Sequence, residues 1–470
     1  MMYPDEMLEK CRFEAQGAVT IRGERIPYTA ISEDNYIYGS DGKPAGSMFT
    51  YSYFRNDIAD PSTRPVLFAF NGGPGSSCLW LHLGIIGPKR LKLDDEVHLP
   101  TTPPFTLEEN PNCLLDMCDL VLIDPVGCGF GRLLNEEQKG MFFSTHGDIR
   151  ALGIVIDNWM TRYGRHNSPI LLAGESYGTC RSALLVGELN GAGPLDSQRL
   201  GIPVNGIMLL GSIFFDPIPA ETSVLNMLTM AATHHYHRPN GKPARDQFLR
   251  EAEAFAAGEY LTALYQGDAL CGAERQKIIE RICYFTGMKE KYVRDHRLRI
   301  DMREFMHLLL EEEGKIVGFY DGRYTWPEDK TIPEFDVIAD DPAMGQYTPA
   351  FHAGISLLKK ELGITFDRSS YGLSQTVNKS WDRKIDQSPT ASLAAAMRRN
   401  PQMRVFFASG LYDLCTTAGN AHYLATHSSL DQSRVKVADY PSGHMAYLGE
   451  ESARLLGEDM REFFSAALHR

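Results

Sequence analysis

Short apolar runs that end in turn residues recur along this chain of 470 residues, and they constrain its fold more than any other feature. Nearly continuous apolarity suits strands that are buried on both faces, as in a parallel sheet covered by helices. Amphipathic helical patterns lie between these runs, and alternation of strands and helices indicates an α/β sheet. The runs cover residues 66–70, 120–124, 170–173, 206–211, 404–409 and 435–439.

Helices are expected in several of the intervening segments. Thr145 followed by Asp148 suggests a capping box, and the apolar residues after it repeat at helical spacing. Residues 179–189 and 351–362 also show helical patterns. The N-terminal part differs, because residues 18–31 and 47–54 alternate in character. We expect them to be antiparallel strands that extend the edge of the same sheet.

The strand signal disappears between about residues 216 and 346. Amphipathic segments with charged outer faces take its place, at residues 246–265, 273–283 and 300–313. Because strands resume afterwards, the block is interpreted as an inserted helical cap rather than as an independent helical domain. The predicted organisation is therefore a core in two parts, residues 1–215 and 347–470, with a cap formed by residues 216–346.

Composition excludes several classes of protein. The formal net charge is −13, and no lysine- or arginine-rich run offsets it, so binding to nucleic acid is not expected. No stretch of 18 apolar residues exists to span a membrane. The first seven residues are acidic and lack the apolar segment of a secretory signal, and the nine cysteines are an odd number, thinly spread. These features predict reduced thiols and a cytoplasmic location.

The run at residues 170–173 leads directly into Gly174-Glu175-Ser176-Tyr177-Gly178, and a helical stretch follows at once. In this arrangement the serine sits on a strained turn with its Oγ exposed, and the glycines let neighbouring backbone approach. The start of the helix directs N–H groups at the site. A strand before the motif and a helix after it favour catalysis by Ser176 over a plain structural turn.

A serine nucleophile needs a base, and the base needs an acid that orients it. In the α/β-hydrolase arrangement the order along the chain is serine, acid, histidine. His444 follows a predicted strand, and Asp413 lies in a loop after another strand, where an α/β sheet presents catalytic groups. Asp439 is the competing acid, but it lies within a strand. The other nearby histidines, His422 and His427, are expected to be surface or packing residues.

A glycine-rich turn follows the strand at residues 66–70, with the sequence Asn71-Gly72-Gly73-Pro74-Gly75-Ser76-Ser77. A glycine pair before proline makes a rigid turn whose backbone N–H groups can point into a cavity. In an α/β hydrolase one such N–H joins the N–H of the residue after the nucleophile to form the oxyanion hole. Here the second donor would be Tyr177.

These motifs together resemble the serine carboxypeptidase family, and they run in family order across most of the chain. The resemblance rests on residues 71–77, 110–111, 123–130, 174–178, 410–413 and 443–445. Residues 80–84 and 318–323 resemble the bacterial branch most. The resemblance implies an α/β-hydrolase fold, with a mostly parallel central sheet, antiparallel N-terminal strands and an inserted helical cap.

The resemblance also implies a role for each matching position. Ser176, Asp413 and His444 would form the catalytic triad. The N–H groups of Gly73 and Tyr177 would form the oxyanion hole. The residues expected to hold the C-terminal carboxylate of a peptide substrate are Asn71, Gly72 and Glu175. A glutamate can bond a carboxylate only if the two share a proton, so the pKa of Glu175 should be raised.

The chain departs from the family pattern at three positions. The family commonly has tryptophan where Ala69 stands and glutamate where Ile85 stands, so the carboxylate-binding network looks thinner here. The cysteine usual in secreted members after the glycine turn is Ser76, which agrees with a reduced compartment.

Two further motifs do not support a binding site. The glycines at residues 127–131 do not match the spacing of a dinucleotide turn, and no cysteine or carboxylate spacing supports a metal site at residues 234–237. No cofactor and no metal are expected.

The sequence thus predicts an enzyme that releases C-terminal residues from peptides through an acyl-enzyme. An esterase or acyltransferase with the same triad is the first alternative, and a non-catalytic binding protein on this scaffold is the second. The preferred C-terminal residues and the oligomeric state are not legible in the sequence.

Overall fold

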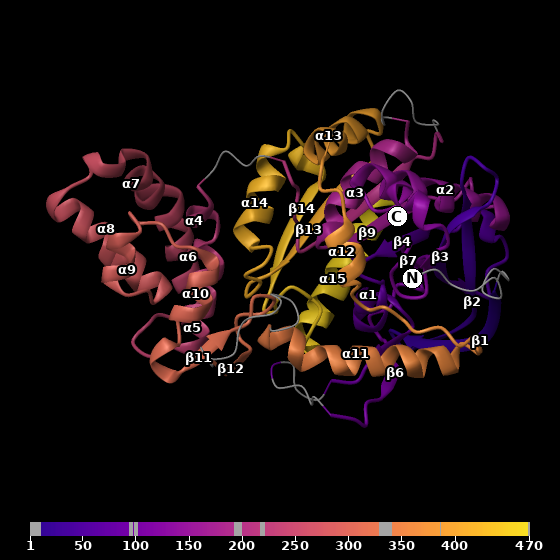
Figure 1. The fold of residues 1–470 in the computed structure, drawn as a ribbon, viewed down its shortest axis with the longest axis horizontal. Helices are drawn as coiled ribbons and strands as arrows, with labels where there is room; N and C mark the ends of the chain where they lie inside the picture. The colour runs from indigo at the N-terminus through magenta and orange to yellow at the C-terminus, as the bar shows by residue number, and fades with distance from the viewer. Residues whose placement is uncertain are drawn as a thin grey trace.

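The computed structural model describes residues 11–93, 97, 102–191, 200–216, 221–328, 341–385 and 387–468. Within these residues a ten-stranded sheet forms the centre, in the order β1-β2-β3-β7-β4-β9-β10-β13-β14, with the short β8 paired to β3 (Figure 1). Its strands are β1 (Arg12–Ile21), β2 (Glu24–Tyr38), β3 (Pro44–Arg55), β4 (Val66–Phe70), β7 (Asp119–Asp124), β8 (Arg132–Leu133), β9 (Ile170–Glu175), β10 (Val204–Leu210), β13 (Arg404–Gly410) and β14 (Val435–Tyr440).

The six strands from β7 to β14 are parallel, and β1 to β3 are antiparallel and extend one edge. The predicted class of sheet is confirmed, as are the six apolar runs as strands. One N-terminal prediction is wrong in detail. Residues 18–31 are not a single strand, because Arg22 and Gly23 take positive φ and turn the chain between β1 and β2.

Helices cover both faces of the sheet. Side chains of a strand alternate between the faces, so Leu67 and Ala69 of β4 enter one hydrophobic cluster while Val66, Phe68 and Phe70 enter the other. The first face is covered by α1 (Leu79–Leu81), α11 (Pro342–Glu361) and α15 (Glu450–Ala467). The second face is covered by α2 (Thr145–Tyr163), α3 (Tyr177–Leu189), α13 (Pro389–Arg399) and α14 (Ala418–His427).

The predicted capping box at the start of α2 is displaced by one residue. Ser144 is the N-cap, and its hydroxyl accepts a hydrogen bond from the N–H of Gly147. Thr145 is the first helical residue. Asp148 therefore does not close a box; it is buried and bonds Arg181 of α3. The buried hydrogen bond between Asp148 and Arg181 therefore takes the place of the capping interaction that the sequence predicted for Asp148.

The segment between β10 and α11 forms a helical block with a hydrophobic cluster of its own. Figure 1 shows these helices at one side of the molecule, beyond α14 and β14. They are α4 (Thr222–Leu225), α5 (Met227–His237), α6 (Arg245–Phe255), α7 (Leu261–Gln266), α8 (Gly272–Thr286), α9 (Glu290–Asp295) and α10 (Met302–Leu308).

The sequence predicted a helical block, but the block also contains two strands. These strands, β11 (Lys315–Val317) and β12 (Thr325–Pro327), pair as an antiparallel hairpin. These strands are too short to give an alternating pattern. Helix α11 runs through the predicted boundary at residue 346 and packs along the sheet (Figure 1). The remaining described elements are a small hairpin, β5 (Lys89–Leu91) with β6 (Leu107–Glu109), and helix α12 (Gln375–Ser380).

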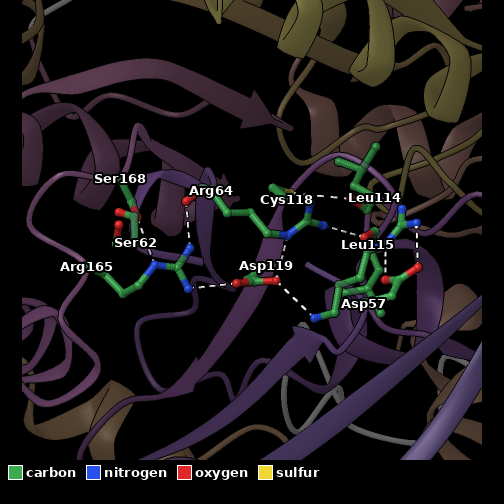
Figure 2. A network of polar contacts seen from close by, with 10 residues as sticks. Asp57, Ser62, Arg64, Leu114, Leu115, Cys118, Asp119, Arg165 and Ser168 are labelled. Atoms are coloured by element: carbon green, nitrogen blue, oxygen red, sulfur yellow. Dashed lines mark hydrogen bonds and ion pairs between the residues drawn. The ribbon is translucent and has the colours of Figure 1, made fainter. Parts of the chain in front are cut away.

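A buried ionic network ties the amino-terminal ends of three parallel strands together (Figure 2). Asp119 opens β7, and its two oxygens accept from Arg64 Nε at 2.9 Å and Arg165 Nη1 at 2.7 Å. Arg64 lies just before β4, and Arg165 lies just before β9. Arg165 also donates to Ser168, so its guanidinium is held on several sides. The two guanidinium groups thus share one carboxylate and donate their other N–H groups to neutral acceptors inside the protein.

The opposite edge of the sheet positions a site. In the pairing of β4 with β9, Phe70 lies beside Gly174, and in the pairing of β13 with β14, Gly410 lies beside Tyr440. The loops that follow these four strands therefore leave the sheet at one edge. They carry the glycine turn at residues 71–77, Ser176, Asp413 and His444.

Candidate active site

Ser176 occupies a strained turn between β9 and α3. Its φ of 59° and ψ of −128° lie outside the regions that a side chain favours, and such strain costs about 1–3 kcal/mol. The turn is tight, because a Cβ on Gly174 would stand 2.1 Å from the carbonyl oxygen of Gly178. Ser176 is partly exposed and lines a pocket. Chain strain and exposure together fit the nucleophile expected from the sequence.

His444 and Asp413 form a buried pair. His444 Nδ1 lies 2.8 Å from Asp413 Oδ2, and Asp413 Oδ1 accepts the N–H groups of Cys415 and Thr416, each at 2.9 Å. Asp413 is thus held on one oxygen by backbone and turned to the imidazole with the other. This arrangement favours the tautomer with the proton on Nδ1, which leaves Nε2 as an acceptor.

The charged form of His444 is favoured by its surroundings. Burial lowers its pKa, but the negative charge of Asp413 and its hydrogen bond, and the charge of Glu175, outweigh burial and raise the pKa above its ordinary value. The backbone N–H of His444 donates to the carbonyl of Tyr320, and the two rings meet edge to face. The imidazole is therefore well placed to accept a proton and to hold the resulting charge.

The competing acid does not face this histidine. Asp439 Oδ2 lies 2.8 Å from His422 Nε2 on α14, so Asp439 belongs to a different pair. His427 stacks on Tyr423 at the surface. Thr416 is a neighbour that sequence reasoning missed; its hydroxyl donates to Asp413 Oδ2 and lies 3.2 Å from His444 Nδ1.

Ser176 and His444 line the same pocket, which has a volume of about 50 Å³. Among the described residues no hydrogen bond joins the two side chains. Catalytic hydrogen bonds are often long before substrate is bound. The further walls come from the glycine turn, the cap junction and the loop after β14, through Asn71, Gly72, Gly73, Ser76, Trp80, Glu175, Tyr320, Met344, Tyr347, Leu373 and Met445.

At Gly72 the glycine turn approaches the backbone at the start of α3. A Cβ on Gly72 would stand 2.4 Å from the backbone nitrogen of Tyr177, so no side chain fits at this position. Gly73 has a φ of 100°, which favours glycine. The two segments that carry the expected oxyanion donors, at Gly73 and Tyr177, are therefore in direct backbone contact. The oxyanion assignment stays a prediction, supported by this contact.

Asn71 and Glu175 form a second buried pair beside the nucleophile. Asn71 Nδ2 donates to Glu175 Oε1 at 2.7 Å, while Asn71 Oδ1 accepts the N–H of Leu81. Burial raises the pKa of Glu175 from its ordinary value near 4.5 to about 7, against the lowering effects of His444 and Asn71. Glu175 thus keeps its proton up to nearly neutral pH, in line with the raised pKa predicted for a group that meets a carboxylate.

Two of the three positions that depart from the family pattern are filled by apolar packing. Ala69 and Ile85 are fully buried in the hydrophobic cluster on the first face of the sheet. Neither can donate a hydrogen bond toward Glu175. The other family motifs act at a distance from the pocket: Asp124 accepts the N–H groups of Cys78 and Phe130, and Asn110 donates to the carbonyl of Ile85.

Metal-ligating side chains were also compared. Among the described residues, the atoms of Asp413, Cys415 and His444 are the group close enough to share an ion, but the histidine and the aspartate already bond each other. The histidines of α5 do not converge: His234, His235 and His237 each bond a different backbone carbonyl. No helix in the described part of the chain has the length and apolarity to cross a membrane.

Part of the chain is similar to known proteins. The family model described as "Serine carboxypeptidase" matches residues 35–189. Serine carboxypeptidase-like 36 of Arabidopsis thaliana is 30% identical over 142 residues, which is 30% of this chain and 27% of that protein. The pheromone-processing carboxypeptidase KEX1 of Arthroderma otae is 32% identical over 146 residues, 29% of this chain and 20% of that protein.

Residues 35–189 of the chain thus match the serine carboxypeptidase family. The matches span about a third or less of the length of these relatives. The family-model match includes Asn71, Glu175 and Ser176 but ends before Asp413 and His444. A placement in the bacterial branch stays a prediction, as does the cytoplasmic location.

A solved structure extends the comparison to nearly the whole chain. The prohormone-processing carboxypeptidase KEX1ΔP of Saccharomyces cerevisiae is 12% identical, and the match covers 92% of this chain and 91% of that one with a TM-score of 0.54. At this identity the likeness speaks for the fold alone. The predicted α/β-hydrolase fold is confirmed.

Proposed function

We propose that this protein is a serine-type carboxypeptidase, which releases C-terminal residues from peptides through an acyl-enzyme. The observation that carries the proposal is the pocket itself. It joins a strained serine, a histidine held by a buried aspartate, and a glutamate whose raised pKa keeps it protonated near neutral pH. A protonated carboxyl beside a nucleophile suits a substrate that ends in a carboxylate.

The reaction begins with Ser176. Its Oγ attacks the carbonyl of the last peptide bond, and His444 Nε2 takes the proton from the hydroxyl. Asp413 fixes the tautomer of the imidazole and stabilises its charge. The N–H groups of Gly73 and Tyr177 stabilise the oxyanion.

His444 then protonates the leaving amine, which departs with the last residue and leaves Ser176 acylated. Water attacks the ester with His444 again as the base, and the peptide shortened at its C-terminus is released. No step needs a cofactor.

The substrate carboxylate would lie at Asn71, the N–H of Gly72 and Glu175. A proton on Glu175 lets it donate a hydrogen bond to that carboxylate, whereas two ionised carboxylates would repel each other. Because the pKa of Glu175 is about 7, substrate binding should weaken as the pH rises through neutrality.

An esterase or acyltransferase is the second candidate, and the apolar residues Ala69 and Ile85 favour it, because they leave the carboxylate site with few donors. Turnover of a blocked dipeptide with a free carboxylate, compared with its amide and its alkyl ester, separates the two. We expect the free acid to be the best peptide substrate. Equal turnover of all three would contradict carboxypeptidase specificity.

A fluorophosphonate probe tests whether the protein is a serine hydrolase. We expect the wild type to be labelled and the Ser176→Ala variant to be unlabelled. Ser433→Ala is a matched control, since Ser433 is exposed and bonds only the nearby Asp431. An unlabelled wild type would favour a non-catalytic binding protein instead.

Glu175→Gln tests the carboxylate site. Glutamine remains a donor at every pH, so we expect the alkaline fall of kcat/KM for a free-acid peptide to flatten. An unchanged profile would mean that Glu175 is not the titrating group.

A further inference from the structure

Two buried oxygens beside the active-site pocket have no hydrogen-bond partner among the described residues. They are Glu175 Oε2 and the hydroxyl of Tyr447. Asn71 satisfies only the other oxygen of Glu175, Oε1. An unsatisfied buried polar atom costs about 1–3 kcal/mol, so two of them beside one pocket need a reason.

The two groups are neighbours. After burial, the charge of Glu175 is the largest cause that raises the pKa of Tyr447, and a contact with Asn71 acts in the opposite direction. Tyr447 in turn is among the groups that lower the pKa of Glu175. The hydroxyl therefore lies near the Asn71–Glu175 pair, but no hydrogen bond joins it to either residue in this structure.

Tyr447 approaches Glu175 from behind the pocket. Its ring does not line the active-site pocket; it lines a second cavity together with Gly84 and Phe351. Gly84 makes room for the ring, because a Cβ there would stand 2.1 Å from a ring carbon of Tyr447. The glycine thus lets a tyrosine from the loop after His444 reach a group that Ile85 cannot bond.

We propose that Tyr447 is a positioning residue of the carboxylate site, whose hydroxyl donates to Glu175 Oε2 when the carboxylate of a substrate enters. This inference rests on the proposed function. A protonated carboxyl group has one carbonyl oxygen and one O–H. With Oε2 accepting from Tyr447, the proton lies on Oε1, whose O–H can be donated to the substrate while a lone pair of the same oxygen still accepts from Asn71 Nδ2. The proton stays on Glu175 throughout, and no bond of the substrate changes.

The test compares Tyr447→Phe with the wild type on two substrates, a blocked dipeptide with a free carboxylate and its amide. We expect KM for the free acid to rise about three- to tenfold near pH 6, the effect of one lost hydrogen bond to an ionisable group, with kcat for the amide within about twofold. The alkaline limb of kcat/KM for the free acid should also move to higher pH, because Tyr447 is among the groups that lower the pKa of Glu175.

Tyr440→Phe is the matched control. Tyr440 is as buried as Tyr447, and its hydroxyl also bonds a carboxylate, that of Asp459, but it lies outside the pocket. We expect it to change neither KM nor the alkaline limb. If the wild type prefers the free acid and Tyr447→Phe behaves like Tyr440→Phe, the inference is overturned while the proposed function stands. If the wild type turns over the free acid and the amide equally, it is the proposed function that fails.

Gly84→Ala provides a second variant that keeps the hydroxyl but displaces the ring. It should raise KM for the free acid more than KM for the amide, in the same direction as Tyr447→Phe. Should Tyr447→Phe fold poorly, Gly84→Ala decides: an equal change for both substrates contradicts the positioning role.

Discussion

The amino-terminal and carboxyl-terminal ends of the parallel strands each hold a buried carboxylate, but the two carboxylates have different surroundings. At the amino-terminal edge, Asp119 is 2% exposed and meets the guanidinium groups of Arg64 and Arg165 (Figure 2). At the carboxyl-terminal edge, Glu175 is also buried, but its hydrogen-bond donor is the neutral amide of Asn71, and one of its oxygens has no partner among the described residues. The first arrangement holds a charge in place, and the second keeps a proton available.

The difference separates stability from function. An ion pair inside the protein needs every partner, since removal of one leaves an uncompensated charge. A protonated carboxyl group carries no charge and tolerates neutral surroundings. The parallel strands therefore carry a buried ionic network at their amino-terminal ends and the candidate active site at their carboxyl-terminal ends.

The largest effect is expected from Asp413→Asn. Two backbone N–H groups hold Oδ1, so the amide oxygen should stay there and the NH₂ group should face His444 Nδ1. That forces the proton of the imidazole onto Nε2, which can then no longer accept from Ser176. We expect kcat to fall by about 10⁴ with little change in stability. Steady-state kinetics and urea unfolding of the same preparation check this. A large loss of stability would contradict the view that Asp413 serves function more than stability.

Asp119→Asn should have the reverse profile. It leaves Arg64 and Arg165 buried with a neutral group, so we expect the free energy of unfolding to fall by about 3–5 kcal/mol. In the folded fraction, kcat should remain within about threefold of the wild type, because Asp119 lies at the far edge. Urea unfolding and active-site titration measure the two quantities. If the free energy of unfolding hardly changes, Asp119 does not stabilise the protein as an ion-paired carboxylate, and it no longer differs from Glu175 in this respect.

The pH dependence of stability should follow from Glu175. Its pKa is about 7 in the folded state and near 4.5 in the unfolded chain, so the folded state binds the proton more tightly. Stability from this group is present at low pH and is lost as the pH rises from about 4.5 to about 7, by up to about 3 kcal/mol. Glu175→Gln should remove that part of the slope in urea unfolding. A parallel curve would show that Glu175 ionises without cost.

The smallest effect on stability is expected from the pair of Asp439 and His422. This pair is intermediate between Asp119 and Glu175, because the charge of its histidine depends on pH. Burial lowers the pKa of His422, but the hydrogen bond and charge of Asp439 and the charge of Glu253 raise it above its ordinary value. Stability from the pair is therefore complete below the unfolded pKa and lost as the pH rises through the folded pKa.

Glu253 lies on α6 and Asp439 on β14, so this cluster joins the helical block to the sheet. Because His422 is about a third exposed, the effect should stay below about 1 kcal/mol. Comparison of wild type and His422→Gln by urea unfolding on either side of neutrality tests it; a difference independent of pH would argue against titration of the histidine.

The sequence was sufficient to predict the site residues whose positions follow from local strand and helix patterns. Ser176 lies between a clear strand and a clear helix, and Asp413 and His444 follow apolar runs, so strand ends alone brought them to one edge. Thr416 and Tyr447 were missed, because their roles depend on which way a loop folds back. Nothing in the sequence marked Asp119, since its two arginine partners lie 55 and 46 residues away. The capping residue of α2 was misassigned because a tertiary contact engages Asp148.

The contact between Gly72 and Tyr177 restricts how this protein could change over time. Both expected donors to the oxyanion belong to the peptide backbone, and Gly72 has no room for a side chain. Substitution can therefore leave the chemical machinery untouched while altering the walls that surround it, chiefly Tyr320 and Met344 at the junction with the helical block. A lineage of such proteins would diversify in the peptides it accepts long before it diversified in the reaction it performs.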